Sequence, residues 1–386
     1  MSNLPKTADV VVIGGGIIGA AVAAFCAKCG ASNVVLIERN ALLGSESTAK
    51  NAGGVRAQFA SESNIRFSLK SIEMLEQWET ALEGHNPHYQ QIGYLFCTSN
   101  AQQMEEFKTR VALQNKLGVS ARLLTPNEIR TMLPYIYADD LVGGTFCQQD
   151  GIIETASLLA AYEKMIRHHG GQIFTETTVT GIETSNSRVR GVLTNRGRIA
   201  TEKIVNAGGA WASKIGQMAE VSIPIFPWRR QVIVTQPLPL ADPFPMLVDA
   251  DTCIYMHKES GGILMGWADP NQPKGFLSGM DEDYNIAMIE KAIPRLPLLE
   301  KAQILTAWAG FYETTPDHHA ILGETKTLQG FYIAAGFSGH GVMHSPATGQ
   351  VMAEIIVNGL AETLDPTPLS LERFTEGKML NESVVI

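Results

Sequence analysis

The chain has 386 residues, of which 45% are hydrophobic and 18% are charged, and its formal net charge is −9. This length and composition indicate a globular protein with a large core and two domains, and they exclude a disordered chain. The acidic balance, with no Lys/Arg cluster longer than Arg229-Arg230, argues against nucleic-acid binding.

The cysteines and the N-terminus bear on the cellular compartment. Five cysteines, an odd number, suggest no disulfide framework and fit a reducing cytosol. Cys26 and Cys29 have CxxC spacing, but they lie in an apolar helical run without a second pair, which favours packed helix cysteines over a redox or metal site. The first nine residues lack the basic region of a signal peptide. The glycines of the apolar run 10–27 fit a strand, a turn and a helix better than a membrane span, so we expect a soluble, cytoplasmic protein.

Residues 9–38 form a predicted βαβ unit. A β-branched strand over 9–13 leads into a turn over 14–19, a helix of small residues over 20–28 follows, and a second strand occupies 33–38. Gly14, Gly16 and Gly19 have the GxGxxG spacing, and Glu38 ends the second strand. A glycine pattern in this context predicts a dinucleotide-binding turn.

The residues of this turn have distinct expected roles. Gly14 permits the tight turn, Gly16 lets a pyrophosphate approach the backbone, and Gly19 allows close packing of helix on strand. Ile17 and Ile18 lie in the turn that leads into the helix, and the N–H groups and partial positive charge of a helix N-terminus attract phosphates.

Three features bear on which dinucleotide binds. Glu38 can accept hydrogen bonds from ribose hydroxyls and would repel a 2′-phosphate, which disfavours NADP. The loop 45–56 is rich in small polar residues and glycine, as suits a cofactor that stays bound and extends deep into the protein. A second Gly-rich segment at 336–341 suits a long cofactor held at both ends. Together these features favour FAD over NAD.

Beyond this unit the sequence predicts alternating helices and strands. Apolar positions at helical spacing indicate a helix over 62–83, and Pro126 marks the first position of a helix that begins at 125–128. The remaining expected elements are a strand at 93–98, helices at 101–117 and 155–169, strands at 172–184, 188–194 and 203–207, antiparallel strands across 223–267, a helix at 281–293, strands at 304–312 and 331–335 on either side of a turn at 315–317, and a helix at 346–358.

These elements predict an α/β fold with a second, α+β domain. The nucleotide-binding pattern opens the chain, but strands with Gly-rich exits recur near 207 and 336. We therefore expect a Rossmann-like FAD-binding domain assembled from discontinuous segments, with a substrate-binding domain of mixed or antiparallel sheet inserted between them. The expected segments are 1–85, 150–220 and 320–386 for the first domain, and 86–149 and 221–319 for the second.

Seven stretches spread over nearly the whole chain carry a resemblance to a known superfamily. They are VVIGGGIIG, NAGGVRAQF, GYLF, QNKLGV, VNAGGAWAS, WAGFYETTPD and YIAAGFSGHGVM. The chain resembles the D-amino-acid oxidase-like FAD-dependent oxidoreductases, and within them the branch of the sarcosine oxidase β-subunit and the dye-linked L-proline dehydrogenase β-subunit. The resemblance implies an extended FAD with its flavin between two domains. It also implies hydride transfer from the carbon next to an amine to flavin N5, giving an imine that water hydrolyses.

The resemblance also implies which residues contact the cofactor. The AMP half is expected at Gly14, Gly16, Ile17, Ile18, Gly19, Glu38 and Arg39, with the adenine near Val179. The pyrophosphate and flavin are expected along Ser45, Ser47, Thr48, Asn51, Ala52, Gly53 and Gly54, the Gly-rich exit at Ala207, Gly208 and Trp211, and Gly310. The pyrimidine end of the flavin is expected at Gly336, Ser338, Gly339, His340, Gly341, Val342 and Met343.

Four residues are candidates for the reaction itself. Arg56 matches a family arginine near the flavin, and Tyr255 matches an active-site tyrosine. Tyr312 is expected either to close the pocket or to pack in the strand core. For His340, we expect the backbone and packing to matter more than the imidazole.

Other charged and imidazole side chains have competing interpretations. Arg230 is a candidate for the substrate carboxylate, against a solvated strand face. His257 lies on the same strand face as Tyr255, and a pocket position competes with a surface one. His318 and His319 follow a turn and are interpreted as solvated. Because no metal-binding spacing occurs, no metal site is expected.

The chain departs from the monomeric sarcosine oxidases at several positions. Gly310 stands where they attach FAD through a cysteine, which predicts noncovalent FAD. Leu264 stands where they carry a lysine that promotes reaction with oxygen, which favours a dehydrogenase or a slow oxidase. Phe59 and Met343 stand where they hold the substrate carboxylate, which leaves Arg56 and Arg230 as candidates.

The function is therefore expected to be FAD-dependent oxidation of the Cα–N bond of an amino acid, with a secondary amine such as proline or a sarcosine-like compound preferred. Two alternatives within this class are a primary L- or D-amino-acid oxidase and the catalytic β-subunit of a hetero-oligomer. The electron acceptor, whether oxygen, a dye or quinone, or a partner subunit, stays open, as does a homo- or hetero-oligomeric state. A flavin-binding module without catalysis is the alternative from another class.

Overall fold

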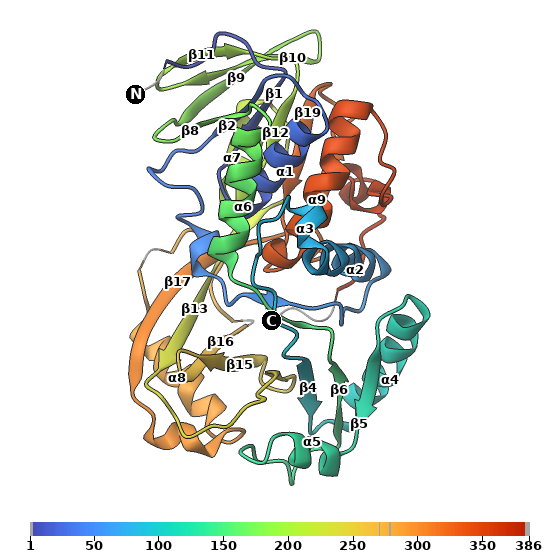
Figure 1. The fold of residues 1–386 in the computed structure, drawn as a ribbon, viewed down its shortest axis with the longest axis vertical. Helices are drawn as coiled ribbons and strands as arrows, with labels where there is room; N and C mark the ends of the chain where they lie inside the picture. The colour runs from blue at the N-terminus through green and yellow to red at the C-terminus, as the bar shows by residue number, and fades with distance from the viewer. Residues whose placement is uncertain (1–2, 270, 278, 383–386) are drawn as a thin grey trace.

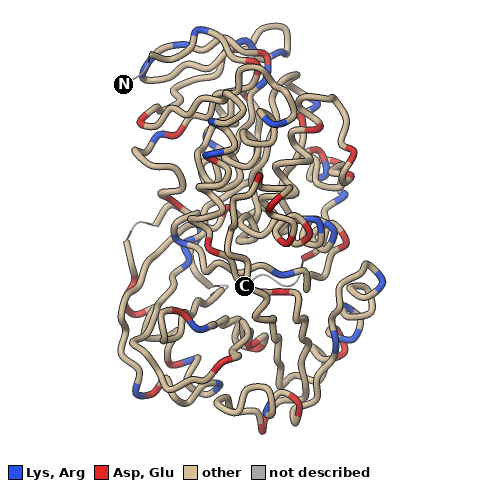
Figure 2. Tube along the Cα trace, in the orientation of Figure 1, with Lys and Arg blue, Asp and Glu red and all other residues tan. Residues whose placement is uncertain are grey.

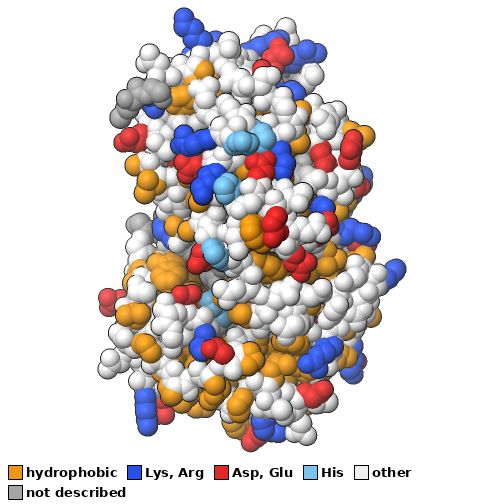
Figure 3. Space-filling view, in the orientation of Figure 1, with side chains coloured by type: hydrophobic (Ala, Val, Ile, Leu, Met, Phe, Trp, Pro, Cys, Tyr) orange, Lys and Arg blue, Asp and Glu red, His pale blue; other side chains and the backbone are white. Residues whose placement is uncertain are grey.

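The structure, a computed structural model, describes residues 3–269, 271–277 and 279–382. Two lobes are stacked along the long axis of the molecule (Figure 1). Residues of both charge signs are interspersed along the trace of the two lobes (Figure 2), and charged side chains of both signs are interspersed on the face seen in Figure 3. Among the helices in the described ranges, none is both long and apolar enough to cross a membrane.

The upper lobe in Figure 1 is built on a six-stranded sheet. Its strand order is β18 (Ile321–Glu324), β19 (Phe331–Ala335), β12 (Ile204–Asn206), β1 (Val10–Ile13), β2 (Val34–Ile37) and β8 (Gln172–Phe174). All neighbours pair in parallel except β18 with β19. Parallel strands end at one edge of a sheet, so the loops after β1, β2, β12 and β19 converge there, and a ligand site is expected at this edge.

Helices cover this sheet. The helix α1 (Ile17–Lys28) is apolar on all sides because it packs between α6 (Thr155–His168) and α9 (Gly341–Ala353). The remaining elements of the lobe are α2 (Glu62–Glu76), α3 (Trp78–Ala81), α7 (Ala212–Met218), a three-stranded sheet of β9 (Val179–Ser185), β10 (Arg188–Thr194) and β11 (Gly197–Ala200), and a two-stranded pair of β3 (Gly54–Val55) and β7 (Gly151–Ile152).

The lower lobe is built on an eight-stranded sheet. Its strand order is β17 (Ile304–Thr314), β13 (Phe226–Thr235), β16 (Gly262–Trp267), β15 (Ile254–Glu259), β14 (Met246–Asp249), β4 (Tyr94–Thr98), β6 (Gly143–Cys147) and β5 (Ala121–Leu124). The parallel pairing of β14 with β4 joins two segments that are far apart in the sequence. The helices of this lobe are α4 (Ala101–Lys116), α5 (Pro126–Met132) and α8 (Glu282–Ala292).

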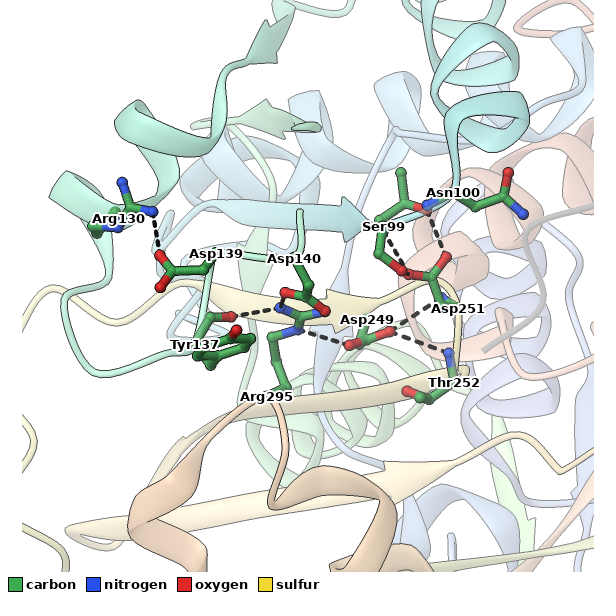
Figure 4. Close-up of polar contacts among 11 residues, drawn as sticks. Ser99, Asn100, Arg130, Tyr137, Asp139, Asp140, Asp249, Asp251, Thr252 and Arg295 are labelled. Carbon is green, nitrogen blue, oxygen red and sulfur yellow. Dashed lines mark hydrogen bonds and ion pairs between the residues drawn. The ribbon is translucent and has the colours of Figure 1, made fainter. Parts of the chain in front are cut away.

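A buried polar network holds the lower lobe together (Figure 4). The guanidinium of Arg295 donates to Asp249 on β14 at 2.8 Å and to both carboxylate oxygens of Asp140 at 2.8 and 3.1 Å. Asp249 is buried, and its carboxylate is satisfied by Arg295 and by the backbone N–H groups of Asp251 and Thr252, both at 3.1 Å. Arg295 therefore ties the chain after α8 to the sheet and to the loop that carries Asp140.

The predicted α/β class is confirmed, and the expected elements form with two main differences. The helix expected over 62–83 is divided into α2 and α3, and the strand expected over 172–184 is divided into β8 and β9. The last helix begins at Gly341, five residues before its expected start at Pro346. Because α9 begins earlier, its N-terminus lies within the glycine segment 336–341.

Candidate active site

A cavity of about 370 Å³ lies where the carboxyl edge of the six-stranded sheet faces the strands β13 and β17. Most residues predicted to contact a cofactor line it. Of the predicted cofactor residues, the lining includes Gly14, Gly16, Ile17, Ile18, Glu38, Arg39, Ser45, Ser47, Thr48, Asn51, Ala52, Gly53, Gly54, Val179, Ala207, Gly208, Trp211, Gly310, Gly339, His340, Gly341, Val342 and Met343. Segments separated by more than 300 residues thus meet around one space.

The turn after β1 has the close packing that its glycines predict. Gly14 has φ +111°, and a Cβ atom there would overlap the carbonyl group of Ala207. A Cβ atom at Gly19 would overlap the carbonyl of Gly14, so Gly19 packs the helix on the strand and does not line the cavity. Glu38 accepts a hydrogen bond from the Gly15 N–H at 2.7 Å. The carboxylate that follows β2 is therefore fixed beside the glycine turn, at the cavity wall.

Two helix N-termini face the cavity. α1 begins after Gly16 and α9 begins after His340, and residues on both sides of each start line the space. The free N–H groups and partial positive charge of a helix N-terminus stabilise anionic groups. The cavity thus carries two separate positions suited to negative charge, one at each glycine-rich segment.

Three tyrosines at the other end of the cavity each fit against a glycine. A Cβ atom at Gly339 would lie 2.5 Å from the Tyr312 ring, and Cβ atoms at Gly54 and Gly266 would overlap the hydroxyl of Tyr94 and the ring of Tyr255. The hydroxyls of Tyr255 and Tyr312 are hydrogen-bonded to each other. Burial raises the pKa of all three tyrosines, so they stay neutral.

Arg56 lies at the cavity with its donors engaged. Its Nη1 donates to the carbonyl of Gln58 at 2.6 Å, and its Nη2 lies 3.4 Å from Nε2 of His340. The guanidinium also stacks 3.9 Å from the centre of the Phe59 ring. Only 1% of Arg56 is exposed. The expected flavin-side arginine is therefore a buried, fixed cation.

Arg230 is the second arginine at the cavity. It is 6% exposed, and its guanidinium lies 4.1 Å from the centre of the Trp228 ring and 5.4 Å from that of Tyr312. Within the described ranges it forms no ion pair; its Nη1 donates to the carbonyl of Arg229 at 3.4 Å, and its Nε has no hydrogen-bond partner. The interpretation as a solvated strand face is wrong, because β17 and the Trp228 ring enclose this side chain.

His340 is buried at the cavity in its neutral form. Burial, with the nearby Arg56 cation, lowers its pKa well below the usual range. Its Nε2 therefore accepts from Arg56, and its ring packs at 4.7 Å against Phe59. These contacts agree with the expectation that His340 acts through packing.

Three other predicted site residues lie behind the cavity wall. Gly336 and Ser338 belong to the tight turn after β19, where a Cβ atom at Gly336 would meet Thr315. His257 is buried, with Nε2 3.1 Å from the carbonyl of Ala52 and Nδ1 2.8 Å from that of Lys258. His257 is thus neither a cavity residue nor a surface one; it supports the loop that contains Ala52.

The interpretation of His318 and His319 as solvated turn residues is wrong. His319 is fully buried, with its two ring nitrogens 2.7 Å from the carbonyl of Asp317 and the hydroxyl of Ser61. Arg373, far along the chain, folds over the turn and donates to both oxygens of the Asp317 carboxylate. His318 is partly buried. The burial of His319 depends on distant residues and could not be predicted from the sequence of the turn.

The departures from the sarcosine oxidase pattern occupy distinct places. Gly310 lines the cavity, and a side chain there would begin 3.0 Å from Cβ of Lys50, which also lines it. Leu264 is buried in an apolar cluster with Tyr255 and Val232. Phe59 is buried beneath the Arg56 guanidinium.

Several lining residues were not predicted. They include Lys50, Tyr94, Thr177, Lys214, Val232, Met246, Phe311 and Glu313. Lys50 lies inside the loop 45–56 and Glu313 inside the stretch WAGFYETTPD, so both positions carried a signal. Tyr94 and Phe311 also lie inside quoted stretches, GYLF and WAGFYETTPD. Lys214, Val232 and Met246 lie on a helix and two strands, and Thr177 lies in a loop, where local periodicity does not indicate which side chains face the cavity.

Comparison with known proteins agrees with this geometry. The chain belongs to the family of FAD-dependent oxidoreductases, which it matches over residues 9–355. It is 31% identical to mitochondrial sarcosine dehydrogenase of Mus musculus, covering 93% of this chain and 40% of that protein. It is 27% identical to mitochondrial dimethylglycine dehydrogenase of Rattus norvegicus, over 91% of this chain and 43% of that protein. The chain thus spans less than half the length of these two relatives.

Solved structures show the same fold. L-proline dehydrogenase from P. horikoshii superposes with a TM-score of 0.89 at 32% identity, over 97% of this chain and 99% of that one. Glycine oxidase from Bacillus cereus superposes with a TM-score of 0.79 at 25% identity, over 92% and 96%. The expected superfamily is confirmed, and the protein is an FAD-dependent oxidoreductase.

The residues around the cavity fit FAD. Two glycine turns leave room for a ligand to approach the backbone, two helix N-termini suit its anionic groups, and Glu38 lies at the position for a ribose.

Proposed function

We propose that the protein oxidises the Cα–N bond of a small neutral amino acid, with a secondary amine such as proline or an N-methyl amino acid preferred. FAD, when bound, supplies the two-electron acceptor for the hydride at the substrate carbon. The imine product is then hydrolysed in water. The observation that carries this proposal is Arg230, a buried cation at the cavity with no carboxylate partner among the described residues.

Arg230 is proposed to bind the substrate carboxylate. An unpaired buried guanidinium is costly, and a carboxylate ligand would offset that cost with charge-assisted hydrogen bonds. Arg56 is the weaker candidate because Gln58 and His340 already engage its donors. The hydrogen-bonded pair of Tyr255 and Tyr312 lies beside Arg230 and supplies hydroxyls for the same carboxylate.

The walls near this end support a compact, apolar substrate. Val232, Met246 and Tyr94 line the cavity there and belong to one apolar cluster. An apolar wall favours methylene or methyl groups over a charged side chain. The names of the similar proteins, which include dehydrogenases of proline, sarcosine and dimethylglycine, agree with this substrate class.

Two features of FAD use are part of the proposal. Gly310 has no side chain to attach the cofactor, so FAD is noncovalent. Leu264 packs in an apolar cluster and brings no cation to the flavin, so reaction of the reduced flavin with oxygen is slow and the protein acts as a dehydrogenase. Whether a partner subunit accepts the electrons is left to experiment.

We further propose that residues 1–85, 150–220 and 320–386 bind FAD, and that residues 86–149 and 221–319 form the substrate side. The six-stranded and eight-stranded sheets support this division, since their strands fall on either side of it.

Substitution of Arg230 tests the carboxylate assignment. Arg230→Met should raise the KM for the best amino-acid substrate by about tenfold to a hundredfold, since a hydrogen bond to a charged group contributes about 1.5–3 kcal/mol and methionine cannot replace the guanidinium. Arg230→Lys should recover part of this loss. Arg229→Met, which removes the neighbouring arginine paired with Asp281, is the matched control. An unchanged KM in Arg230→Met with FAD still bound would contradict the assignment.

A further inference from the structure

Glu313 is a carboxylic acid in the cavity wall to which the proposed reaction gives no role. It lies on β17 directly after Tyr312, and in the sheet it stands opposite Pro227 of β13. Proline has no backbone N–H, so β13 offers no N–H donor at the position opposite Glu313.

Glu313 is bound to the turn that follows β19. Its Oε1 accepts a hydrogen bond from the Phe337 N–H at 3.3 Å, and its main-chain carbonyl accepts from the Ser338 N–H at 3.0 Å. The Gly336 N–H also donates to the carboxylate. Glu313 therefore fixes the start of the segment that continues to Gly339 and Gly341 in the cavity wall.

The second carboxylate oxygen of Glu313 points toward another glycine segment. Oε2 is buried and has no hydrogen-bond partner in the described residues. It lies 3.4 Å from the position that a Cβ atom of Gly209 would occupy. Gly208 in turn packs against Gly14 of the phosphate-binding turn, since a Cβ atom at Gly14 would lie 3.3 Å from the Gly208 Cα. The unpartnered oxygen thus lies beside Gly209, which together with Gly208 lines the part of the cavity where the pyrophosphate is expected.

Burial raises the pKa of Glu313 to about 7, and the Gly336 and Phe337 N–H groups oppose this shift. Within the described ranges, no ion pair or hydrogen bond joins Glu313 to a charged side chain. The charged or titratable side chains on the elements packed around it are Arg229 and Arg230 on β13, Lys214 on α7, Lys50 on the turn 47–50, Tyr312 on its own strand and His340 after the turn.

We propose that Glu313 is a positioning residue of the FAD site that works as a neutral acid, and that loss of its proton weakens the binding of FAD. The neutral acid holds the 336–341 segment through Oε1 and brings no charge close to the pyrophosphate. The carboxylate keeps the same hydrogen bond but adds a buried negative charge beside the expected pyrophosphate, and within the described ranges it has no ion-pair partner.

The pH dependence follows from linkage. FAD binding favours the protonated form, so it raises the pKa of Glu313 above its value in the free protein. FAD affinity is then highest below about pH 7 and falls as the pH rises through that value, by at most about tenfold for each pH unit. His340 does not contribute, because its pKa lies well below this range.

The experiment measures the equilibrium release of FAD on dilution of the holoenzyme, by the fluorescence of free flavin, from pH 6 to pH 8.5. For the natural chain we expect the Kd for FAD to rise by about tenfold across this range. Glu313→Gln keeps the acceptor for the Phe337 N–H but cannot ionise, so its Kd should change by less than about twofold and be lower than that of the natural chain at pH 8.5. Glu105→Gln, which removes an exposed carboxylate on α4, should retain the natural pH dependence.

Glu313→Leu separates positioning from charge. It removes the hydrogen bonds to the 336–337 backbone and the proton together, so its Kd for FAD should be raised about equally at pH 6 and pH 8.5. A natural chain whose Kd is the same at both pH values would overturn the proposal. So would a Glu313→Gln variant that weakens with pH as the natural chain does. Because the readout is FAD binding, a failure of the proposed amino-acid oxidation would leave this test unaffected.

Discussion

Gly266 on β16 lies directly against the ring of Tyr255 on β15, its partner in the antiparallel pairing. A Cβ atom at Gly266 would overlap the Tyr255 hydroxyl, and Cε1 of the ring would be 2.8 Å away. The ring covers the glycine, which leaves the tyrosine hydroxyl aimed at Tyr312. Gly266 therefore determines where the Tyr255 hydroxyl lies at the cavity.

The variant Gly266→Ala should displace Tyr255 and break its hydrogen bond with Tyr312. The expected result is a fall in kcat/KM of about fivefold to tenfold, since one hydrogen bond contributes about 1–1.4 kcal/mol, with FAD content unchanged. Gly181→Ala on β9 is the control, because a Cβ atom there makes an ordinary contact of 3.4 Å with Leu193. Full activity in Gly266→Ala would show that the activity does not depend on the contact between Gly266 and the Tyr255 ring.

His340→Asn should leave FAD bound and reducible. The histidine is neutral and accepts from Arg56, and an asparagine oxygen can take the same hydrogen bond. We expect the anaerobic rate of flavin reduction to stay within about tenfold of the natural rate, since at most one neutral hydrogen bond is altered. Loss of all reduction in a protein that still binds FAD would show that the imidazole itself is required.

His344→Gln should change how stability depends on pH. Burial lowers the pKa of His344 to about 3, and its Nε2 lies 2.9 Å from the Ser68 hydroxyl. The unfolded chain takes up this proton below about pH 6.5 while the folded chain does not, so the stabilising contribution is full above pH 6.5 and is lost as the pH falls.

Denaturant unfolding at pH 7 and pH 5 measures this effect. The free energy of unfolding should fall with decreasing pH less steeply in His344→Gln than in the natural chain, by about 1.4 kcal/mol for each pH unit below 6.5. His88→Gln removes an exposed histidine and should retain the natural slope. Equal slopes for all three proteins would show that His344 ionises in the folded state.

Arg295→Met should destabilise the lower lobe. It leaves Asp249 buried without its partner, which costs about 3–5 kcal/mol. Arg130→Met removes an exposed ion pair with Asp139 and should cost less than about 1 kcal/mol. Both arginines are seen in Figure 4. The check is thermal unfolding of the holoenzymes, and similar melting temperatures for the two variants would refute the buried-pair account.

Local patterns were enough to predict the cofactor side of the site. The glycine turn and Glu38 lie within one βαβ unit, so their geometry depends on nearby residues. The segment 336–341 was recognised by its glycines, although the start of α9 was expected five residues too late. These features need little knowledge of the tertiary fold.

The substrate side could not be predicted in the same way. Arg230 is buried because β17 pairs beside β13, and His319 is buried because Arg373 folds over it from more than fifty residues away. The carboxylate of Glu313 accepts its hydrogen bond from the turn that follows β19. In each case the environment of the side chain comes from long-range packing that local periodicity does not encode.

The central claim, oxidation of a small amino acid at its Cα–N bond, is tested most directly by flavin absorbance under anaerobic conditions. L-proline, sarcosine, glycine and D-amino acids are added separately to the purified holoenzyme, and air is admitted after any reduction. We expect L-proline or an N-methyl amino acid to bleach the flavin band, and the band to return slowly in air. A flavin that no amino acid bleaches would contradict the claim.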